Sequence, residues 1–164
     1  MSTAVLNEKV EVFKKSITDI VELLNNTEES TLYVKPSETE WSAMQIVAHV
    51  LEAVDFWVED LEALLIVPGA KWGRNHEHVR RLAAVEENKV GQLKKEDAIE
   101  ALQNLVPRVE AALGKVKEAD LEKTAPSYNP NFDGKPLSFL IDHLIVKHVV
   151  GHHDQIVRHL AKVK

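Results

Sequence analysis

The feature that most constrains this chain is the spacing of its large apolar residues. Near the start they follow one another at alternating steps of four and three: Leu6, Val10, Phe13, Ile17, Ile20 and Leu24. Side chains spaced in this way line one face of an α-helix, as in helices packed lengthwise in a bundle. No segment shows the alternation of apolar and polar residues that marks a half-buried strand. The sequence therefore predicts an all-α fold.

Three further segments carry helical periodicity and complete a predicted four-helix bundle. The second helix is expected to begin at Ser42, which has the spacing of a capping box with Gln45, and to run to about Leu65. The third and fourth helices are predicted over about residues 97–118 and 137–163. The connections between helices 1 and 2 and between helices 2 and 3 are longer than an antiparallel helix hairpin needs. Crossover connections are therefore permitted.

The longer connection, between the second and third helices, carries some structure of its own. Residues 77–89 are expected to form a short extra helix, and residues 73–78 before them an exposed loop. The chain has no internal repeat and no low-complexity tract. We therefore expect a single domain spanning residues 1–164, a length sufficient to bury a core.

Composition narrows the partners and the location. The formal net charge is −6 and no run of Lys and Arg is longer than two residues, which argues against nucleic acid as a partner. The chain has no cysteine, so disulfides, thiolate metal ligands and a cysteine nucleophile are excluded. No stretch approaches about 18 uninterrupted apolar residues, and the first residues mix in charges too early for a signal peptide. We expect a cytoplasmic protein with no membrane partner.

Two histidines lie inside the apolar stripe of the last predicted helix. The stripe runs through Ile141, Ile145, His148, His152 and Ile156. Four residues advance a helix by roughly 400°, which leaves the two imidazoles about 40° apart around the axis and about 6 Å apart along it, close enough to hold one metal ion. His49 is the candidate third ligand, because it borders the apolar stripe of the second helix.

A structural explanation of these histidines stays open, since a single hydrogen bond can satisfy a lone buried imidazole. Two imidazoles in the same stripe are harder to explain in that way, because each would need its own partner. One divalent ion would compensate both rings and also join two helices. Three imidazoles without a thiolate would leave a fourth position open on a zinc-like ion, as catalytic zinc sites do.

The remaining histidines fit a shared site less well. His143, His153 and His159 point in other directions from the same helix, and His76 and His78 lie in a polar loop. We therefore expect these five side chains to lie outside the metal site.

Carboxylates near the three histidines are candidates for proton transfer. Glu52 lies one helical turn after His49 and is our choice for the catalytic group, as a general base or as a group that orients a ligand. Asp55 and Asp154 are the alternatives. Each of the three could instead be a solvated surface charge.

Motifs at two places in the chain resemble a known family. They are Trp41-Ser42 opening the helix that reaches His49, and His148-x-x-x-His152 followed by Asp154-Gln155-Ile156. In order and spacing they resemble the DinB-like (DinB/YfiT) superfamily of four-helix-bundle proteins, which are regarded as metalloenzymes, and the likeness spans nearly the whole chain. It implies that His49, His148 and His152 bind zinc, nickel or another divalent ion. Many members have a glycine before the glutamine where this chain has His153-Asp154, a departure that leaves the three histidines intact.

The resemblance also implies a range of functions. Relatives include thiol-dependent transferases and isomerases, hydrolases and toxin-resistance proteins, often as dimers. We therefore expect a homodimer that acts on a small molecule. The family name refers to induction by DNA damage and does not imply DNA binding, which agrees with the acidic charge of this chain.

Two functions of different classes follow. The first is an enzyme, a hydrolase or thiol-dependent transferase, in which the ion held by the three histidines activates a water or a low-molecular-weight thiol and Glu52 handles a proton. The second is a non-catalytic bundle that binds or sequesters a small molecule, with a structural metal or none. The histidine triplet favours the enzyme, whereas the absence of an unmistakable acid or base beside it favours the binding protein.

Overall fold

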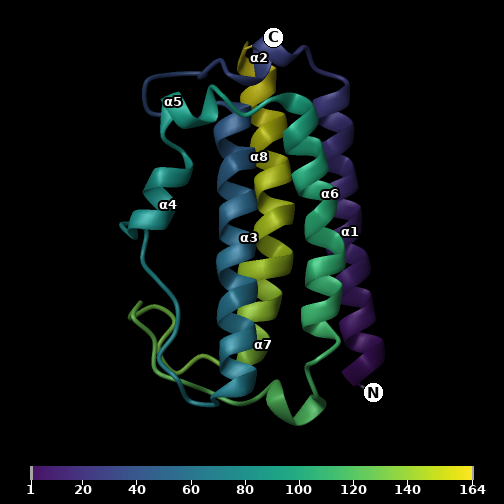
Figure 1. Cartoon of the computed structure of the whole chain (residues 1–164), viewed down its shortest axis with the longest axis vertical. Helices are drawn as coiled ribbons and strands as arrows, with labels where there is room; N and C mark the ends of the chain where they lie inside the picture. Colours follow the sequence, from purple (N-terminus) through teal and green to yellow (C-terminus); the bar gives the residue numbers. More distant parts are fainter. Residues whose placement is uncertain (1, 164) are drawn as a thin grey trace.

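The computed structural model describes residues 2–163, which form a bundle of long helices joined by segments with shorter ones (Figure 1). The long helices are α1 (Ser2–Asn25), α3 (Ala43–Ile66), α6 (Lys95–Leu113) and a last helix made of three consecutive pieces, α7 (Leu137–Phe139), η2 (Leu140–Val146) and α8 (Lys147–Val163). The described residues contain no β-strand, which confirms the all-α prediction. None of their helices is long and apolar enough to span a bilayer.

The connections differ from the prediction in three respects. The third long helix ends at Leu113 and not near residue 118, so the segment between α6 and α7 is long as well. The region expected to hold one short helix holds two, α4 (Val79–Ala84) and α5 (Glu87–Val90). Further short elements are α2 (Glu29–Leu32) and η1 (Glu118–Asp120).

The long helices are arranged so that helices consecutive in the chain are not always neighbours. α1 packs against α6 and α8, and α3 packs against the same two helices (Figure 1). α1 and α3 therefore lie across a diagonal of the bundle, and the segment of residues 26–42 crosses one end to join them. This arrangement brings α3 beside α8, although the two helices are far apart in the sequence.

Local signals in the sequence define the helices that carry the histidines. Ser42 Oγ accepts a hydrogen bond from the Gln45 amide at 3.1 Å, and Gln45 Oε1 accepts one from the Ser42 amide at 2.8 Å. This capping box, predicted from the spacing, starts α3 and therefore sets its rotation and the position of His49. η2 is a π-helix that lies directly before α8, and π-helical turns occur frequently near functional sites.

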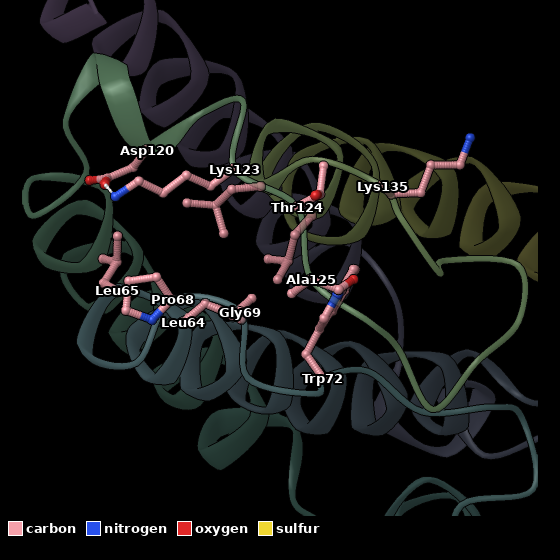
Figure 2. Close-up of a pocket in the computed structure, with 12 residues that line it drawn as sticks. Leu64, Leu65, Pro68, Gly69, Trp72, Asp120, Lys123, Thr124, Ala125 and Lys135 are labelled. Carbon is pink, nitrogen blue, oxygen red and sulfur yellow. Dashed lines mark hydrogen bonds and ion pairs between the residues drawn. The ribbon is translucent and has the colours of Figure 1, made fainter.

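A small cavity lies at the end of α3, between the loop that follows this helix and the segment before α7 (Figure 2). Leu64, Trp72 and Leu140 contribute apolar walls, and Lys123 pairs with Asp120 at 2.9 Å on one side. Its volume is about 20 Å³, which is room for about one water molecule. This cavity is too small to bind a metabolite.

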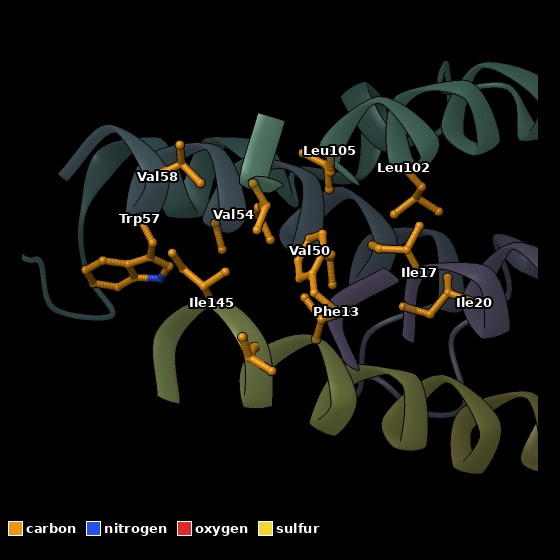
Figure 3. Close-up of a cluster of buried hydrophobic side chains, with 14 of the residues drawn as sticks. Phe13, Ile17, Ile20, Val50, Val54, Trp57, Val58, Leu102, Leu105 and Ile145 are labelled. Carbon is orange, nitrogen blue, oxygen red and sulfur yellow. The ribbon is translucent and has the colours of Figure 1, made fainter. Parts of the chain in front are cut away.

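The core is apolar and is formed by all the long helices (Figure 3). Phe13 from α1, Val50 from α3, Leu102 from α6 and Ile145 from η2 are fully buried and gather between the helices. The six residues of the stripe predicted near the start of the chain are all buried, as the spacing required. Burial of each large apolar side chain contributes about 1.5–3 kcal/mol, so this packing holds the helices in register.

Candidate functional site

Three histidine side chains from two helices meet where α3 packs against α8. The Nε2 atom of His148 lies 3.2 Å from Nε2 of His49 and 3.0 Å from Nε2 of His152. One ring nitrogen from each residue lies within 4.8 Å of the other two. Nitrogens bound to one ion at about 2.1 Å, with angles of about 90–110° between them, lie roughly 3.0–3.4 Å apart. The two distances from His148 fall in this range, and the three histidines form a group that could hold a single ion.

The helices hold these rings by ordinary packing. His49 is only 4% exposed and follows Ile46 on the inward face of α3. His148 and His152 are one turn apart on α8, between the fully buried Ile145 and Ile156. The three imidazoles thus occupy core positions, as the pattern of the sequence suggested.

Burial and mutual proximity keep the rings neutral. Desolvation, together with the neighbouring His148 and His152, lowers the pKa of His49 to about 2. Desolvation and the adjacent His152 lower the pKa of His148 to about 3, and desolvation also lowers the pKa of His152. Neutral imidazole is the form that binds metal ions, so the three rings are in the protonation state that a metal site requires.

The Nδ1 atoms of the three histidines differ in their hydrogen-bond partners. His152 Nδ1 lies 2.7 Å from Oε1 of Gln155, so this nitrogen carries the proton and leaves Nε2 with a free lone pair. The Nδ1 atoms of His49 and His148 are buried and have no hydrogen-bond partner among the described residues. The polar contacts of these two rings are therefore limited to the cluster of Nε2 atoms. A cation bound there would stabilise rings that otherwise carry an uncompensated cost of burial.

A cavity of about 280 Å³ opens onto the three histidines. Its other walls come from Trp57, Phe132 and Leu144, which are apolar, and from Arg74, Asn75 and Arg81. This volume is close to the lower end of the range for small-molecule sites. The cavity therefore suits a small ligand with both apolar and polar parts.

Arg74 is a buried wall of this cavity, with its side chain only 2% exposed. Its two terminal nitrogens donate to the two carboxylate oxygens of Glu52 at 2.8 and 2.6 Å. The guanidinium carbon also lies 4.1 Å from the centre of the Phe56 ring. The backbone carbonyl of Arg74 accepts a hydrogen bond from Asn129 Nδ2 at 3.0 Å. These contacts fix both the backbone and the side chain.

Gly73 allows the loop to present Arg74 in this way. Its φ of +87° lies in the region that favours glycine, and an added Cβ would lie 2.6 Å from Ser127 Oγ. The expectation of an exposed loop over residues 73–78 is wrong at its start, since Gly73 and Arg74 are buried by the segment of residues 125–132. Residues 75–77 are exposed as expected.

Arg81 lines the cavity from α4. One of its terminal nitrogens donates to the backbone carbonyl of His76 at 3.1 Å, and its guanidinium carbon lies 5.6 Å from the centre of the Trp41 ring. The same Trp41 ring contacts His49, with ring centres 5.2 Å apart. Trp41 thus links Arg81 to the histidine cluster.

The candidate carboxylates lie away from the histidine cluster. Glu52 is bound to Arg74 and does not line the cavity. Asp55 pairs with Arg108, and Asp154 is exposed beside His153. The structure thus gives Glu52 direct contact with a cavity wall, but not with the histidines.

The other histidines lie outside the cluster, in agreement with the sequence analysis. His159 Nδ1 lies 2.7 Å from the backbone carbonyl of Trp41, and His143 packs against Phe139. His76 differs from the expectation in one respect, because it lines the cavity although it is exposed.

Comparisons with known proteins support the fold and the family. A family model described as the DinB superfamily matches residues 13–156. Among solved structures, YfiT from Bacillus subtilis matches with a TM-score of 0.78 and 14% sequence identity, over 96% of this chain and 86% of that chain. That protein is described as a probable metal-dependent hydrolase with an unusual four-helix bundle topology. At this identity the likeness shows a shared fold. No match was found among curated proteins.

Proposed function

We propose that this chain, which belongs to the DinB superfamily, binds one divalent metal ion through His49, His148 and His152 and acts on a small molecule as a metal-dependent enzyme. The family membership expected from the motifs is confirmed by the model that matches most of the chain. The observation that carries the proposal is the convergence of three neutral imidazoles at the wall of a cavity, where Nε2 of His148 lies 3.2 Å from that of His49 and 3.0 Å from that of His152.

The residues around the cluster have distinct roles in this proposal. A divalent ion held there would lower the pKa of a bound water or thiol and so supply a nucleophile near neutral pH. Gln155 orients His152, and the apolar walls from Trp57, Phe132 and Leu144 limit access of bulk water to the reacting groups. Glu52, our sequence-based choice for the base, is better placed to position Arg74 than to take a proton at the histidines.

Hydrolysis is the reaction we favour, because the structural neighbour YfiT is described as a probable metal-dependent hydrolase. Transfer to a low-molecular-weight thiol is the alternative reaction at the same site. A non-catalytic binding or sequestration bundle is the second candidate function. It is favoured by a specific observation: no carboxylate lines the cavity in the part of the chain that the structure describes.

Metal analysis of protein purified without an affinity tag tests the proposal. We expect about one zinc or nickel ion per chain, and we expect His152→Ala to lose it because a ligand is removed. His153→Ala is the matched control, since it removes the neighbouring imidazole, which is outside the cluster. Equal metal affinity in parent and His152→Ala would show that the three-histidine site is wrong.

A second measurement separates the enzyme from the binding bundle. The visible spectrum of the cobalt-substituted protein should change when acetohydroxamate or 2-mercaptoethanol is added, because an accessible coordination position exchanges ligands. An unchanged spectrum in folded, cobalt-loaded protein would favour the binding bundle. The homodimer and the cytoplasmic location remain predictions, and light scattering of the purified protein checks the first.

A further inference from the structure

We infer that Arg81, assisted by Arg74, forms an anion-binding subsite beside the three histidines, and that the small molecule bound in this cavity carries a carboxylate. The inference deepens the proposed function and rests on it for the group that reacts at the histidines.

The first observation is the contrast between two adjacent arginines on α4. Arg80 points toward the acidic face of α3, where it donates to Glu59 at 2.9 Å and lies 3.5 Å from Asp55. Arg81 lies toward the cavity and, within residues 2–163, has no carboxylate at ion-pair distance. Among the described residues, its side chain donates one hydrogen bond, to the neutral backbone carbonyl of His76. A half-buried guanidinium without a counter-charge is costly unless a ligand supplies the charge.

The second observation is the charge of the cavity as a whole. Two guanidinium groups line it, and none of its wall residues is an aspartate or glutamate. Glu52 forms its hydrogen bonds with Arg74 and acts on Arg81 only from a distance, so Arg81 has no carboxylate partner of its own among the described residues. The chain as a whole has a net charge of −6, so the cavity is a positive site in an acidic protein. Such a site attracts anions and concentrates them locally.

The third observation is the donor capacity of Arg81. A guanidinium has five N–H donors in a planar fork that matches the two oxygens of a carboxylate. The carbonyl of His76 uses one of the donors, so a bidentate contact remains possible. Burial and the charge of Arg74 also lower the pKa of Arg81, and a bound anion would offset both effects. The cavity volume of about 280 Å³ favours a short carboxylic acid over a nucleotide or a sugar phosphate.

Trp41 lies close to both Arg81 and the histidine cluster. Its ring centre lies 5.2 Å from that of His49 and 5.6 Å from the guanidinium carbon of Arg81. A short molecule could therefore place its carboxylate at Arg81 and its reacting group at the histidines. Fixing one end of the molecule in this way would orient the other end for reaction.

Binding of matched acid and amide ligands tests the inference. The probes are 3-mercaptopropionate and 3-mercaptopropionamide, which share a thiol and differ in charge, titrated into the cobalt-loaded protein at constant ionic strength. We expect the acid to bind about tenfold more tightly than the amide, as charge-assisted hydrogen bonds allow. In Arg81→Gln the ratio should fall close to one, and Arg81→Lys should keep part of the preference because it keeps the charge. Arg158→Gln, which removes the same charge from an exposed position on α8, should keep the parental ratio.

A metal-free arm separates this inference from the proposed function. In protein treated with a chelator, succinate should raise the melting temperature more than succinamide does, and Arg81→Gln should abolish the difference. If the protein takes up no metal, the proposed function fails and this arm alone decides the anion subsite. Retention of the full acid preference in a folded Arg81→Gln protein, or equal binding of acid and amide by the parent, would overturn the inference. In the first case the cobalt ion itself, and not Arg81, binds the carboxylate.

Discussion

The α1–α6 and α3–α8 interfaces use different kinds of side chain. The residues that α6 buries are all apolar, and they pack against the apolar stripe of α1, which includes Phe13 and Ile17. At the α3–α8 interface, His49 meets His148 and His152, and Arg74 is buried beside them. The first interface gains free energy from every side chain that it buries. The second places polar groups where burial is costly unless partners are supplied.

A single helix serves both environments. On α3, His49 and Val50 are adjacent in the sequence, and both are buried. Successive residues on a helix point about 100° apart, so Val50 contributes to the apolar core while His49 faces the cavity. The bundle can therefore carry a costly polar site, because its apolar core supplies the stability. Stability and metal binding should therefore respond to different substitutions.

A substitution in the apolar core should change the stability most. Phe13→Ala should lower the free energy of unfolding by about 3–5 kcal/mol, because it removes a fully buried aromatic ring and leaves a cavity. Metal bound per folded molecule should stay unchanged, since Phe13 does not line the histidine cavity. Denaturant unfolding and metal analysis of the folded fraction check the two parts. Phe13→Leu, which keeps more of the volume, should lose much less stability. A loss of metal in the folded Phe13→Ala protein would break the separation between the two regions.

The buried ion pair between Glu52 and Arg74 gives the second prediction. Glu52→Ala should lower the free energy of unfolding by about 3 kcal/mol, because it leaves the buried guanidinium of Arg74 without its carboxylate. Glu59→Ala is the matched control on the same helix. Its carboxylate pairs with Arg80 at the surface and should contribute less than about 1 kcal/mol.

A double-mutant cycle sharpens this expectation. Glu52→Ala, Arg74→Met and the double variant should show a coupling of about 2 kcal/mol or more in denaturant unfolding, since the two groups form a bidentate pair. Additive effects would mean that Glu52 does not stabilise the fold through its contact with Arg74.

The same two regions differ in how far the sequence predicts them. The stripe of α1 and the spacing of His148 and His152 follow from the period of the helix, so both were foreseeable. The periodicity of the third helix continued to Val116, which is buried, although the helix ends at Leu113. At this position the periodic pattern predicted correctly that the side chain is buried, but not that the backbone has left the helix.

The positions of Arg74 and Arg81 at the cavity could not be predicted from local sequence patterns. Arg74 is buried because Gly73 and Asn129 join segments far apart in the sequence, and no periodic signal describes such a contact. The dipeptide Arg80-Arg81 read only as a short basic run, and the direction of each side chain depends on how α4 packs against α3. One local signal was present, since Gly73 lies in a long connection, where a glycine often marks a backbone conformation that other residues rarely adopt.

At the histidine cluster, a substitution should change the stability only slightly, and the direction of the change should depend on metal. In the metal-free protein, His148→Leu should raise the free energy of unfolding by about 1 kcal/mol. The reason is that it replaces an imidazole whose Nδ1 is buried without a partner among the described residues by an apolar side chain of similar size. In the presence of zinc the order should reverse, because the parent gains stability from an ion that the variant cannot hold with three ligands. Melting curves of both proteins, with chelator and with zinc, check the reversal.

Val149→Ala provides the contrast from a fully buried apolar position on the same helix, and it should be destabilised to the same extent in both conditions. If His148→Leu is less stable than the parent without metal and still gains the full stabilisation by zinc, His148 is a structural residue and the polar part of the bundle has another purpose.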